Sequence, residues 1–435
     1  MEIQRNVFKE LIRWKSNPGR KPLILQGARQ VGKTWLLKRF GKDHFDSVAY
    51  FNFDRQVELK QFFETTKNPQ RILQNLSLVH GKAILPQTTL VIFDEIQECN
   101  GALNALKYFN EEAPEYAIAC AGSLLGVAMS RGASFPVGKV EFIQIHPVTF
   151  AEFLSAADPV LFGYLENMDT IEPIPDIFFN PLTDKLKMFY ITGGMPEPVV
   201  ALLENRDVEF TQNALQQILT SYTLDFSKHV ENKDIPKIHH IWSSLPSQLS
   251  RENKKFLYQT VKSGARAREY EDALLWLVNA GLVHRVYCSS KPSLPLSAYD
   301  ELTAFKIYMN DTGLLRRLSL LNPVAIAEGN RLLTEFKGAL TENFILQSLV
   351  QQFEGTPRYW KSEGRAEVDF LVQHQNTIIP VEVKSDKNVK SKSLAFYRSA
   401  FNPATSIRYS MQNLKREGGL INIPLFMVDY TKKFL

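Results

Sequence analysis

The stretch that decides the fold reads Gly27-Ala28-Arg29-Gln30-Val31-Gly32-Lys33-Thr34 and matches the pattern G-x-x-x-x-G-K-[ST]. An apolar stretch at 22–25 precedes it, and a helical pattern at 35–40 follows it, with Gly41 as the expected helix end. Glycines in such a loop let backbone N–H groups curl around phosphate oxygens, and the helix N-terminus adds its positive dipole. The sequence therefore predicts a phosphate-binding loop that runs from Gly27 through Trp35.

Two side chains of this loop have predicted roles. Lys33 is expected to reach the β- and γ-phosphates of ATP, and the Thr34 hydroxyl is expected to ligate Mg²⁺. The plain alternative is a chance match on a turn. The apolar strand before the loop and the helix after it argue against that alternative.

A second motif, at residues 88–95, ends an apolar strand with two acids. Ligands of open α/β sheets bind beyond the carboxyl ends of the strands. We therefore expect Asp94 to hold the magnesium shell and Glu95 to polarise the attacking water. Ser123 follows the next apolar strand and is expected to contact the γ-phosphate, the alternative being an ordinary Gly-Ser turn.

Strands alternate with helices through the N-terminal part of the chain, which predicts an α/β fold with a parallel sheet covered on both faces. The strands after the first are expected at 48–53, 90–93, 116–121 and 141–145. An ATPase module is thus predicted over 1–155. Two further modules, over 156–330 and 331–435, are predicted to follow it.

The middle module begins with residues 156–185, which carry six acids, one lysine and four prolines and are predicted to be a linker or surface insertion. The rest of this module is expected to be mostly helical. A helix at 270–280 followed by a strand at 282–287 suggests a winged helix.

The composition is that of an ordinary globular protein, since 44% of the 435 residues are hydrophobic and 22% are charged. The three cysteines form no C-x-x-C pair, so neither a zinc ribbon nor a disulfide framework is expected. The longest nearly apolar run, at 116–129, is too short to span a bilayer, and we see no signal peptide. These features predict a cytoplasmic protein without a membrane partner.

In the C-terminal module a hairpin is predicted at 366–384, with its turn at 375–376, and further strands are expected near 405–410 and 424–429. In that register Asp369 lies opposite Glu382, and two facing carboxylates repel unless a cation lies between them. The pair therefore indicates a metal site for phosphodiester hydrolysis, with Lys384 stabilising charge on the attacked phosphate or positioning the water. The alternative in the same register is a surface ion pair between Glu367 and Lys384, with both acids solvated.

Positive charge gathers in the C-terminal module. Residues 384–416 contain eight lysines and arginines against one acid, Asp386. Such an excess suits a polyanion, which here would be DNA or RNA, although a solvated basic face explains the charge equally well.

The chain resembles a family of AAA+-type bacterial and archaeal ATPases related to signalling NTPases. The resemblance rests on residues 26–34, 93–97, 122–123 and 147–153, and continues through 190–196 and 311–315. It implies an extra strand between the two nucleotide motifs, which 48–53 fits. Relatives often carry Gly-Arg after the sensor strand. Here Lys139 stands in place of that arginine, and Arg131 is the substitute candidate for a finger.

The C-terminal hairpin looks like the D…E-x-K core of restriction-endonuclease-like nucleases. That resemblance implies a further acid on the preceding helix, which Glu342 fits, so the implied metal core is Glu342, Asp369 and Glu382. Two functions follow from these features. One is an ATPase that couples nucleotide state to nucleic-acid binding or cleavage. The other is a slow ATP-dependent signalling switch whose C-terminal module only contacts proteins. Either function is compatible with a homo-oligomer.

Overall fold

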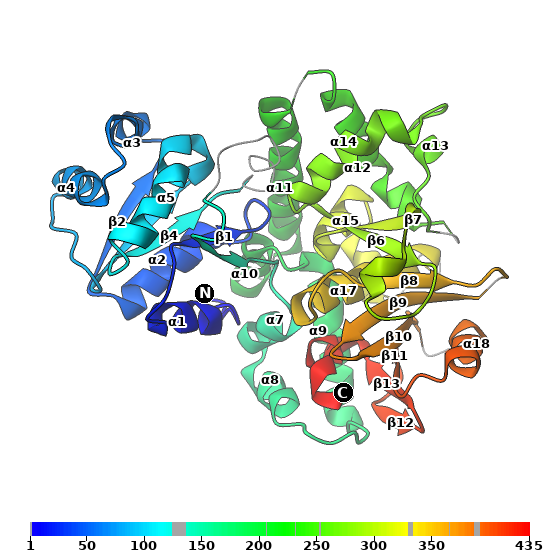
Figure 1. The fold of residues 1–435 in the computed structure, drawn as a ribbon. Helices are drawn as coiled ribbons and strands as arrows, with labels where there is room; N and C mark the ends of the chain where they lie inside the picture. The colour runs from blue at the N-terminus through cyan, green and yellow to red at the C-terminus, as the bar shows by residue number, and fades with distance from the viewer. Residues whose placement is uncertain are drawn as a thin grey trace. The chain divides into compact units, whose positions relative to one another are not determined.

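The computed structural model describes residues 2–123, 136–205, 207–230, 232–251, 254–328, 334–364, 366–386 and 392–435. They form two compact units (Figure 1). The smaller unit, here called the loop unit, comprises residues 5–146 and 279–281. The larger unit comprises 1–4, 147–278 and 282–435. None of the helices in the described ranges has the length and apolar character needed to cross a bilayer.

The loop unit is built on a five-stranded parallel sheet with the order β2-β3-β4-β1-β5. The strands are β1 (Leu23–Gln26), β2 (Ser47–Asn52), β3 (Thr89–Asp94), β4 (Ala117–Ala121) and β5 (Glu141–Gln144). All five lie within one or two residues of their predicted bounds. The predicted parallel α/β sheet is therefore confirmed, including the extra strand β2 between the two nucleotide motifs.

Helices cover both faces of this sheet. One face packs against α3 (Lys60–Thr65), α4 (Pro69–His80) and α5 (Asn100–Glu112), through a core that contains Phe51, Phe63, Phe93 and Phe109. The other face carries α1 (Phe8–Ser16) and α2 (Lys33–His44), whose rings Phe8 and Phe40 lie 6.4 Å apart.

The prediction that α2 ends at Gly41 is wrong, because the helix continues to His44. A Cβ atom at position 41 would lie 2.5 Å from Cγ2 of Val48 on β2. Gly41 therefore lets the helix approach the sheet closely and does not terminate it.

The larger unit begins with helices. They are α7 (Phe150–Ala157), α8 (Pro159–Glu166), α9 (Asp176–Thr192), α10 (Pro196–Asn205), α11 (Val208–His229), α12 (Ile235–Leu249), α13 (Tyr258–Val261) and α14 (Ala267–Asn279). The stretch 156–185, predicted to be a linker or surface insertion, thus forms the end of α7, all of α8 and the first part of α9. Pro159 occupies the first turn of α8, where no intrahelical N–H bond is lost, whereas Pro181 lies inside α9, which continues past it.

An eight-stranded mixed sheet follows, with the order β12-β13-β11-β10-β9-β8-β6-β7. Its strands are β6 (Val283–Ser289), β7 (Asp300–Met309), β8 (Arg358–Lys361), β9 (Glu367–His374), β10 (Thr377–Val383), β11 (Ser406–Ser410), β12 (Lys415–Glu417) and β13 (Leu420–Pro424). Strand β6 pairs antiparallel with β7 and parallel with β8. The helix-then-hairpin pattern of the middle module and the C-terminal strands therefore share one sheet.

The remaining helices of this unit are α15 (Thr312–Leu318), α16 (Pro323–Glu328), α17 (Thr334–Gln352), α18 (Lys392–Phe401) and the 3₁₀ segment η5 (Leu425–Phe434). The strand predicted at 424–429 is wrong, because β13 ends at Pro424 and η5 takes its place. A short apolar run gives no periodic signal that separates a buried strand from a buried helix.

Candidate functional site

The loop between β1 and α2 has the backbone of a phosphate cradle. Three of its residues have positive φ: Gly27 at 146°, Gln30 at 65° and Gly32 at 94°. A Cβ atom at position 27 would lie 2.2 Å from the carbonyl oxygen of Ile145. Gly27 is thus required both for its dihedral angle and for the close approach of Ile145, directly after β5. Gly32 lets α2 begin with its first N–H groups directed at the loop.

Lys33 is the first residue of α2, and only 6% of its surface is exposed. Its Nζ donates hydrogen bonds to the carbonyl oxygens of Gly27, at 2.8 Å, and Ala28, at 2.7 Å. Burial lowers the pKa of Lys33 to about 8, while the carboxylates of Glu95 and Asp94 oppose this shift. The ammonium group is therefore held at the mouth of the loop, beside the place where the phosphates are predicted to bind.

Thr34 and Asp94 meet, as the two motifs predict. The Thr34 hydroxyl donates to Oδ1 of Asp94 at 2.9 Å. Asp94 ends β3 and is 5% exposed, and its Oδ2 accepts hydrogen bonds from the Tyr50 hydroxyl at 2.6 Å and the Asn52 amide at 3.2 Å. Burial and the bond to Asp94 raise the pKa of Tyr50 to about 12, so this phenol stays a donor.

Glu95 lies in the left-handed region, with φ 49°, directly after β3. Its Oε2 accepts hydrogen bonds from the Gln97 amide at 2.6 Å and from the Ser123 hydroxyl at 3.3 Å. The structure therefore brings Glu95 and Ser123 together at the carboxyl ends of β3 and β4, which are neighbouring strands.

The other predicted residues of the loop differ in exposure. Ala28 and Val31 are buried, Arg29 and Gln30 are exposed, and Trp35 is 45% exposed on the first turn of α2. Lys139, at the position where relatives carry a finger arginine, forms an ion pair with Glu111 at 2.8 Å. Arg131, the substitute candidate, lies outside the described residues.

Three residues that support this site were not predicted: Arg5, Tyr50 and Asn52. Arg5 donates to the carbonyl oxygens of Val31, at 3.3 Å, and His146, at 2.7 Å, and so ties the loop to the chain after β5. Tyr50 and Asn52 lie two residues apart on β2 and so share one face of the strand. Strand β2 pairs with β3 in a register that puts Asn52 beside Asp94. A period-two pattern of polar residues on the extra strand was the available signal.

The C-terminal hairpin has the predicted register. Val381 pairs with Phe370 and Thr377 with His374, which places Asp369 opposite Glu382. Asp369 accepts a hydrogen bond from the Val383 N–H at 2.8 Å. Burial and the nearby carboxylates of Glu342 and Glu382 raise the pKa of Asp369 well above its usual value.

The alternative ion pair between Glu367 and Lys384 is wrong. Lys384 bonds Glu382 at 2.7 Å, and Glu367 bonds Lys306 of β7 at 2.6 Å. Glu382 is also buried and not solvated, being 4% exposed.

Lysines hold the predicted acids of this cluster. Glu342, on α17, forms an ion pair with Lys254 and accepts a hydrogen bond from the Tyr308 hydroxyl at 3.1 Å. Burial alone would raise the pKa of Glu342, but Lys254 and Lys306 hold it below its usual value. Within the described ranges, no group of three or more histidine, cysteine, aspartate or glutamate side chains is arranged to hold a metal ion.

Sequence reasoning missed Lys254, Lys306 and Tyr308, which reach the cluster from the middle module. Lys306 is 1% exposed within an otherwise apolar run of β7, and a lone lysine in such a run was the available signal.

The basic segment 384–416 is only partly a charged surface. Arg408 is 8% exposed and donates to Asn422 at 3.0 Å, Arg416 donates to the Phe434 carbonyl, and Lys415 pairs with Glu417. Lys387 and Lys390 lie outside the described residues. Lys392 is exposed on α18 and stays available to an anion.

Comparison with protein families divides the chain into three matched stretches. Residues 19–154 match a family model described as an AAA domain. Residues 183–325 and 337–427 match two domains of unknown function, DUF8612 and DUF4143. The first match, together with the five-stranded parallel sheet, supports an AAA-type P-loop ATPase domain in the N-terminal part of the chain.

Several solved structures are similar at low identity. The Walker-type ATPase PABY2304 of Pyrococcus abyssi is 14% identical, with a TM-score of 0.45, over 73% of this chain and 96% of that chain. The Orc1 protein of Aeropyrum pernix, solved in complex with DNA, is 13% identical, with a TM-score of 0.30, over 75% and 95%. The Holliday junction branch migration motor RuvB of Thermotoga maritima is 14% identical, with a TM-score of 0.31, over 65% and 90%. Likenesses at these scores say nothing about the function of this chain, and no curated protein matches it.

Proposed function

We propose that this chain binds ATP with Mg²⁺ in the loop of residues 27–35 and hydrolyses it, and that nucleotide state controls the binding or cleavage of nucleic acid by the larger unit. The observation that carries the first part is the 2.9 Å hydrogen bond between Thr34 and Asp94, with the buried Lys33 ammonium beside it. A hydroxyl and a strand-end carboxylate in contact are the pair that P-loop ATPases use around their metal.

The proposed roles follow from these positions. The loop N–H groups and Lys33 hold the phosphates, Thr34 and Asp94 hold the magnesium shell, and Tyr50 and Asn52 fix the Asp94 carboxylate. Glu95 accepts the proton of the attacking water. Ser123, which bonds Glu95 at 3.3 Å, is placed to exchange that bond for one to the γ-phosphate. Bound magnesium would neutralise charge on the β- and γ-phosphates.

The ATPase proposal is tested by two substitutions. Lys33→Ala should abolish measurable ATP binding, whereas Glu95→Gln should keep ATP affinity within about twofold and lower kcat by at least about 100-fold. Lys42→Ala and Glu112→Gln change exposed residues of the same unit and serve as matched controls. Wild-type hydrolysis by Glu95→Gln would remove Glu95 from the mechanism, and ATP binding by Lys33→Ala would overturn the site.

For the larger unit, the proposed site is the cluster of Glu342, Asp369 and Glu382 with Lys384. Among the described residues these acids are not already gathered as a metal site, but Oε2 of Glu382 is buried without a hydrogen-bond partner, and this favours a divalent cation beside it. The raised pKa of Asp369 has the same origin, which is the crowding of carboxylates in a partly dry place. A divalent cation would supply Lewis-acid chemistry for phosphodiester hydrolysis, with Lys384 beside the attacked phosphate.

Cleavage is tested with plasmid DNA and structured RNA in Mg²⁺ or Mn²⁺. Asp369→Asn should lose at least about 100-fold in cleavage rate relative to wild type. Asp184→Ala, at an exposed carboxylate of α9, is the control. Equal cutting by wild type and Asp369→Asn would rule out this cluster as the source of cleavage.

The second candidate function is an ATP-dependent switch whose larger unit does not cut. The ion pairs of Lys254 with Glu342 and Lys384 with Glu382 favour it, because they neutralise two of the three acids without a metal. Under this function, Mn²⁺ leaves the unfolding temperature unchanged. Under the first function, Mn²⁺ raises that temperature in wild type and not in Asp369→Asn.

A further inference from the structure

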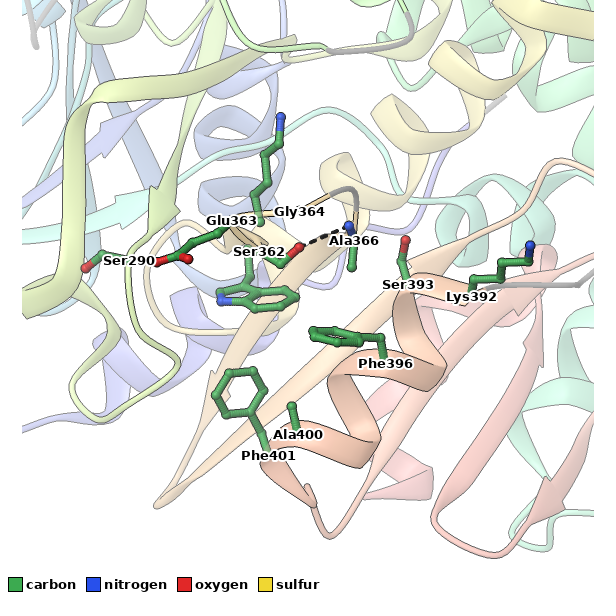
Figure 2. A pocket seen from close by; sticks show the side chains of 12 residues that line it. Ser290, Ser362, Glu363, Gly364, Ala366, Lys392, Ser393, Phe396, Ala400 and Phe401 are labelled. Carbon is green, nitrogen blue, oxygen red and sulfur yellow. Dashed lines mark hydrogen bonds between the residues drawn. The ribbon is translucent and has the colours of Figure 1, made fainter.

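A cavity of about 760 Å³ lies where the end of β8 meets α18, and its lining shares no residue with either site described above (Figure 2). The residues that matter in its wall are Ser290, Lys361, Ser362, Lys392, Phe396 and Phe401. The volume falls within the range of about 300–1,000 Å³ that small-ligand pockets span. All of these residues belong to the larger unit.

The wall is an aromatic platform on a rigid support. Trp360 is 5% exposed and belongs to a buried cluster with Val368, Leu371 and Tyr397. The Phe396 ring lies nearly parallel to the Trp360 indole, at 18° and 6.3 Å between centroids, and Phe401 meets that indole edge-on at 5.4 Å. Figure 2 shows Phe396 and Phe401 projecting from α18 toward the cavity.

The outer rings of this platform are open to solvent. Phe396 is 52% exposed and Phe401 is 44% exposed. Exposing two large aromatic rings to water is unfavourable. The buried Trp360 indole contacts both rings from the core side, so they cannot move inward to bury their exposed faces. The platform therefore presents flat apolar faces that another flat group can cover.

The rim of the cavity is polar and mainly positive. Lys361 and Lys392 are exposed, and the serines 290, 362 and 393 add hydroxyl groups. Glu363 is the one acid in the lining, and its carboxylate can accept hydrogen bonds from the amino groups of a base. Aromatic faces between lysines match a ligand that alternates flat rings with phosphates.

We propose that this cavity binds unpaired bases of a single-stranded nucleic acid, which stack on Phe396 and Phe401 while Lys361 and Lys392 contact the flanking phosphates. The inference deepens the nucleic-acid part of the proposed function and rests on it. A duplex is disfavoured, because its bases are already stacked and paired. An apolar peptide would cover the rings but would leave the two lysines without anionic partners.

The test is fluorescence anisotropy with the full-length protein and four labelled probes: dT20, rU20, a duplex of the same length, and an uncharged apolar peptide. Wild type should bind dT20 or rU20 at least about tenfold more tightly than the duplex and the peptide. The two single strands decide between DNA and RNA. Phe396→Ala should weaken single-strand binding about tenfold, and Phe396→Tyr, which keeps the ring, should stay within about twofold of wild type. Lys392→Gln should reduce the dependence of binding on salt concentration.

Matched controls separate the outcomes. Ile177→Ala removes a side chain that is 75% exposed on α9 and should bind as wild type does. If wild type binds single strands and Phe396→Ala binds them equally well, the cavity is not the site, although nucleic-acid binding stands. If wild type binds none of the nucleic acids, both the cavity proposal and the proposed coupling to nucleic acid fail. The proposal of ATP hydrolysis does not depend on this outcome. Preferred binding of the apolar peptide would assign the cavity to a protein partner and overturn the proposal.

Discussion

Lys33 is kept out of water by the loop that it serves. Its Nζ bonds two loop carbonyls, and burial brings its pKa to about 8. A lysine with this pKa is still mostly protonated at neutral pH, but burial has removed much of the usual preference for the charged form. The phosphates of ATP would restore that preference, because they place several negative charges within contact distance of Nζ.

This pKa predicts a pH dependence of ATP binding. Free Lys33 loses its proton as the pH rises through about 8, whereas the ATP complex keeps it, so binding takes up a proton at alkaline pH. Between pH 7.5 and pH 9 the Kd for ATP with magnesium should rise about eightfold. Calorimetry in two buffers of different ionisation enthalpy measures both the Kd and the proton uptake. A flat Kd without proton uptake at pH 9 would contradict the prediction.

At the residue scale, sequence reasoning identified the groups that we propose act on phosphate and missed the residues that hydrogen-bond to them. Lys33, Thr34, Asp94 and Glu95 stand in motifs whose spacing reflects the chemistry. Tyr50 contacts Asp94 across neighbouring strands, and the pairing of β2 with β3 is a non-local fact that no local pattern contains. The same holds for Lys306, which reaches Glu367 from a strand far away in the sequence.

At the scale of elements, one tight junction joins the end of α9 to the start of α15. Asp311 caps the N-terminus of α15 and accepts hydrogen bonds from the N–H groups of Gly194, at 2.6 Å, and Leu314, at 2.9 Å. Gln347 of α17 bonds Thr312 at the same place. Because α17 also carries Glu342, this junction fixes the helix that supplies one acid of the proposed metal cluster.

Two glycine substitutions, one at this junction and one within α8, are expected to have opposite effects on stability. A Cβ atom at Gly194 would lie 2.1 Å from the backbone oxygen of Val148, so Gly194→Ala should lower the free energy of unfolding by about 3 kcal/mol. Gly163, within α8, has no heavy atom within 4 Å of its added Cβ, so Gly163→Ala should raise that free energy by about 0.5–1 kcal/mol. Urea denaturation followed by circular dichroism measures both. Equal effects of the two substitutions would mean that close packing at Gly194 is not what the glycine provides.

Elements that stand between clear helical patterns were predictable, and elements defined by tertiary context were not. The five parallel strands are short apolar runs between helical patterns, and their bounds follow from the sequence. The segment after Pro424 is equally apolar, because Leu425, Phe426, Met427 and Val428 are all buried, so neither period stands out. Gly41 misled for a related reason, since its role is to let α2 approach β2 and not to end the helix.

At the scale of the whole molecule, the sheet of the larger unit crosses the boundary that composition suggests. Strands β6 and β7 come from the middle stretch, and β8 joins them to the C-terminal strands in parallel pairing. The acid–lysine cluster uses side chains from both stretches, namely Lys254 and Lys306 on one side and Glu342 and Glu367 on the other. A change of conformation in the middle stretch would therefore alter the charges that Glu342 and Asp369 experience. Under the proposed function, nucleotide state would act on the cluster through this middle stretch.

Such coupling has a quantitative signature, because linkage is reciprocal. If ATP changes the affinity for a single strand by some factor, the strand must change the affinity for ATP by the same factor. Glu95→Gln isolates binding from turnover, so both factors can be measured at equilibrium. We expect a factor of at least about five in each direction, and the two factors should agree within error. Phe396→Ala should weaken binding of the single-stranded nucleic acid, so the two affinity factors are measured at higher nucleic-acid concentration. Once that ligand is saturating, both factors should equal those of the parent protein. A factor of one in Glu95→Gln, with both ligands bound, would mean that the two sites act independently and would leave an ATPase and a nucleic-acid binder that share only a chain.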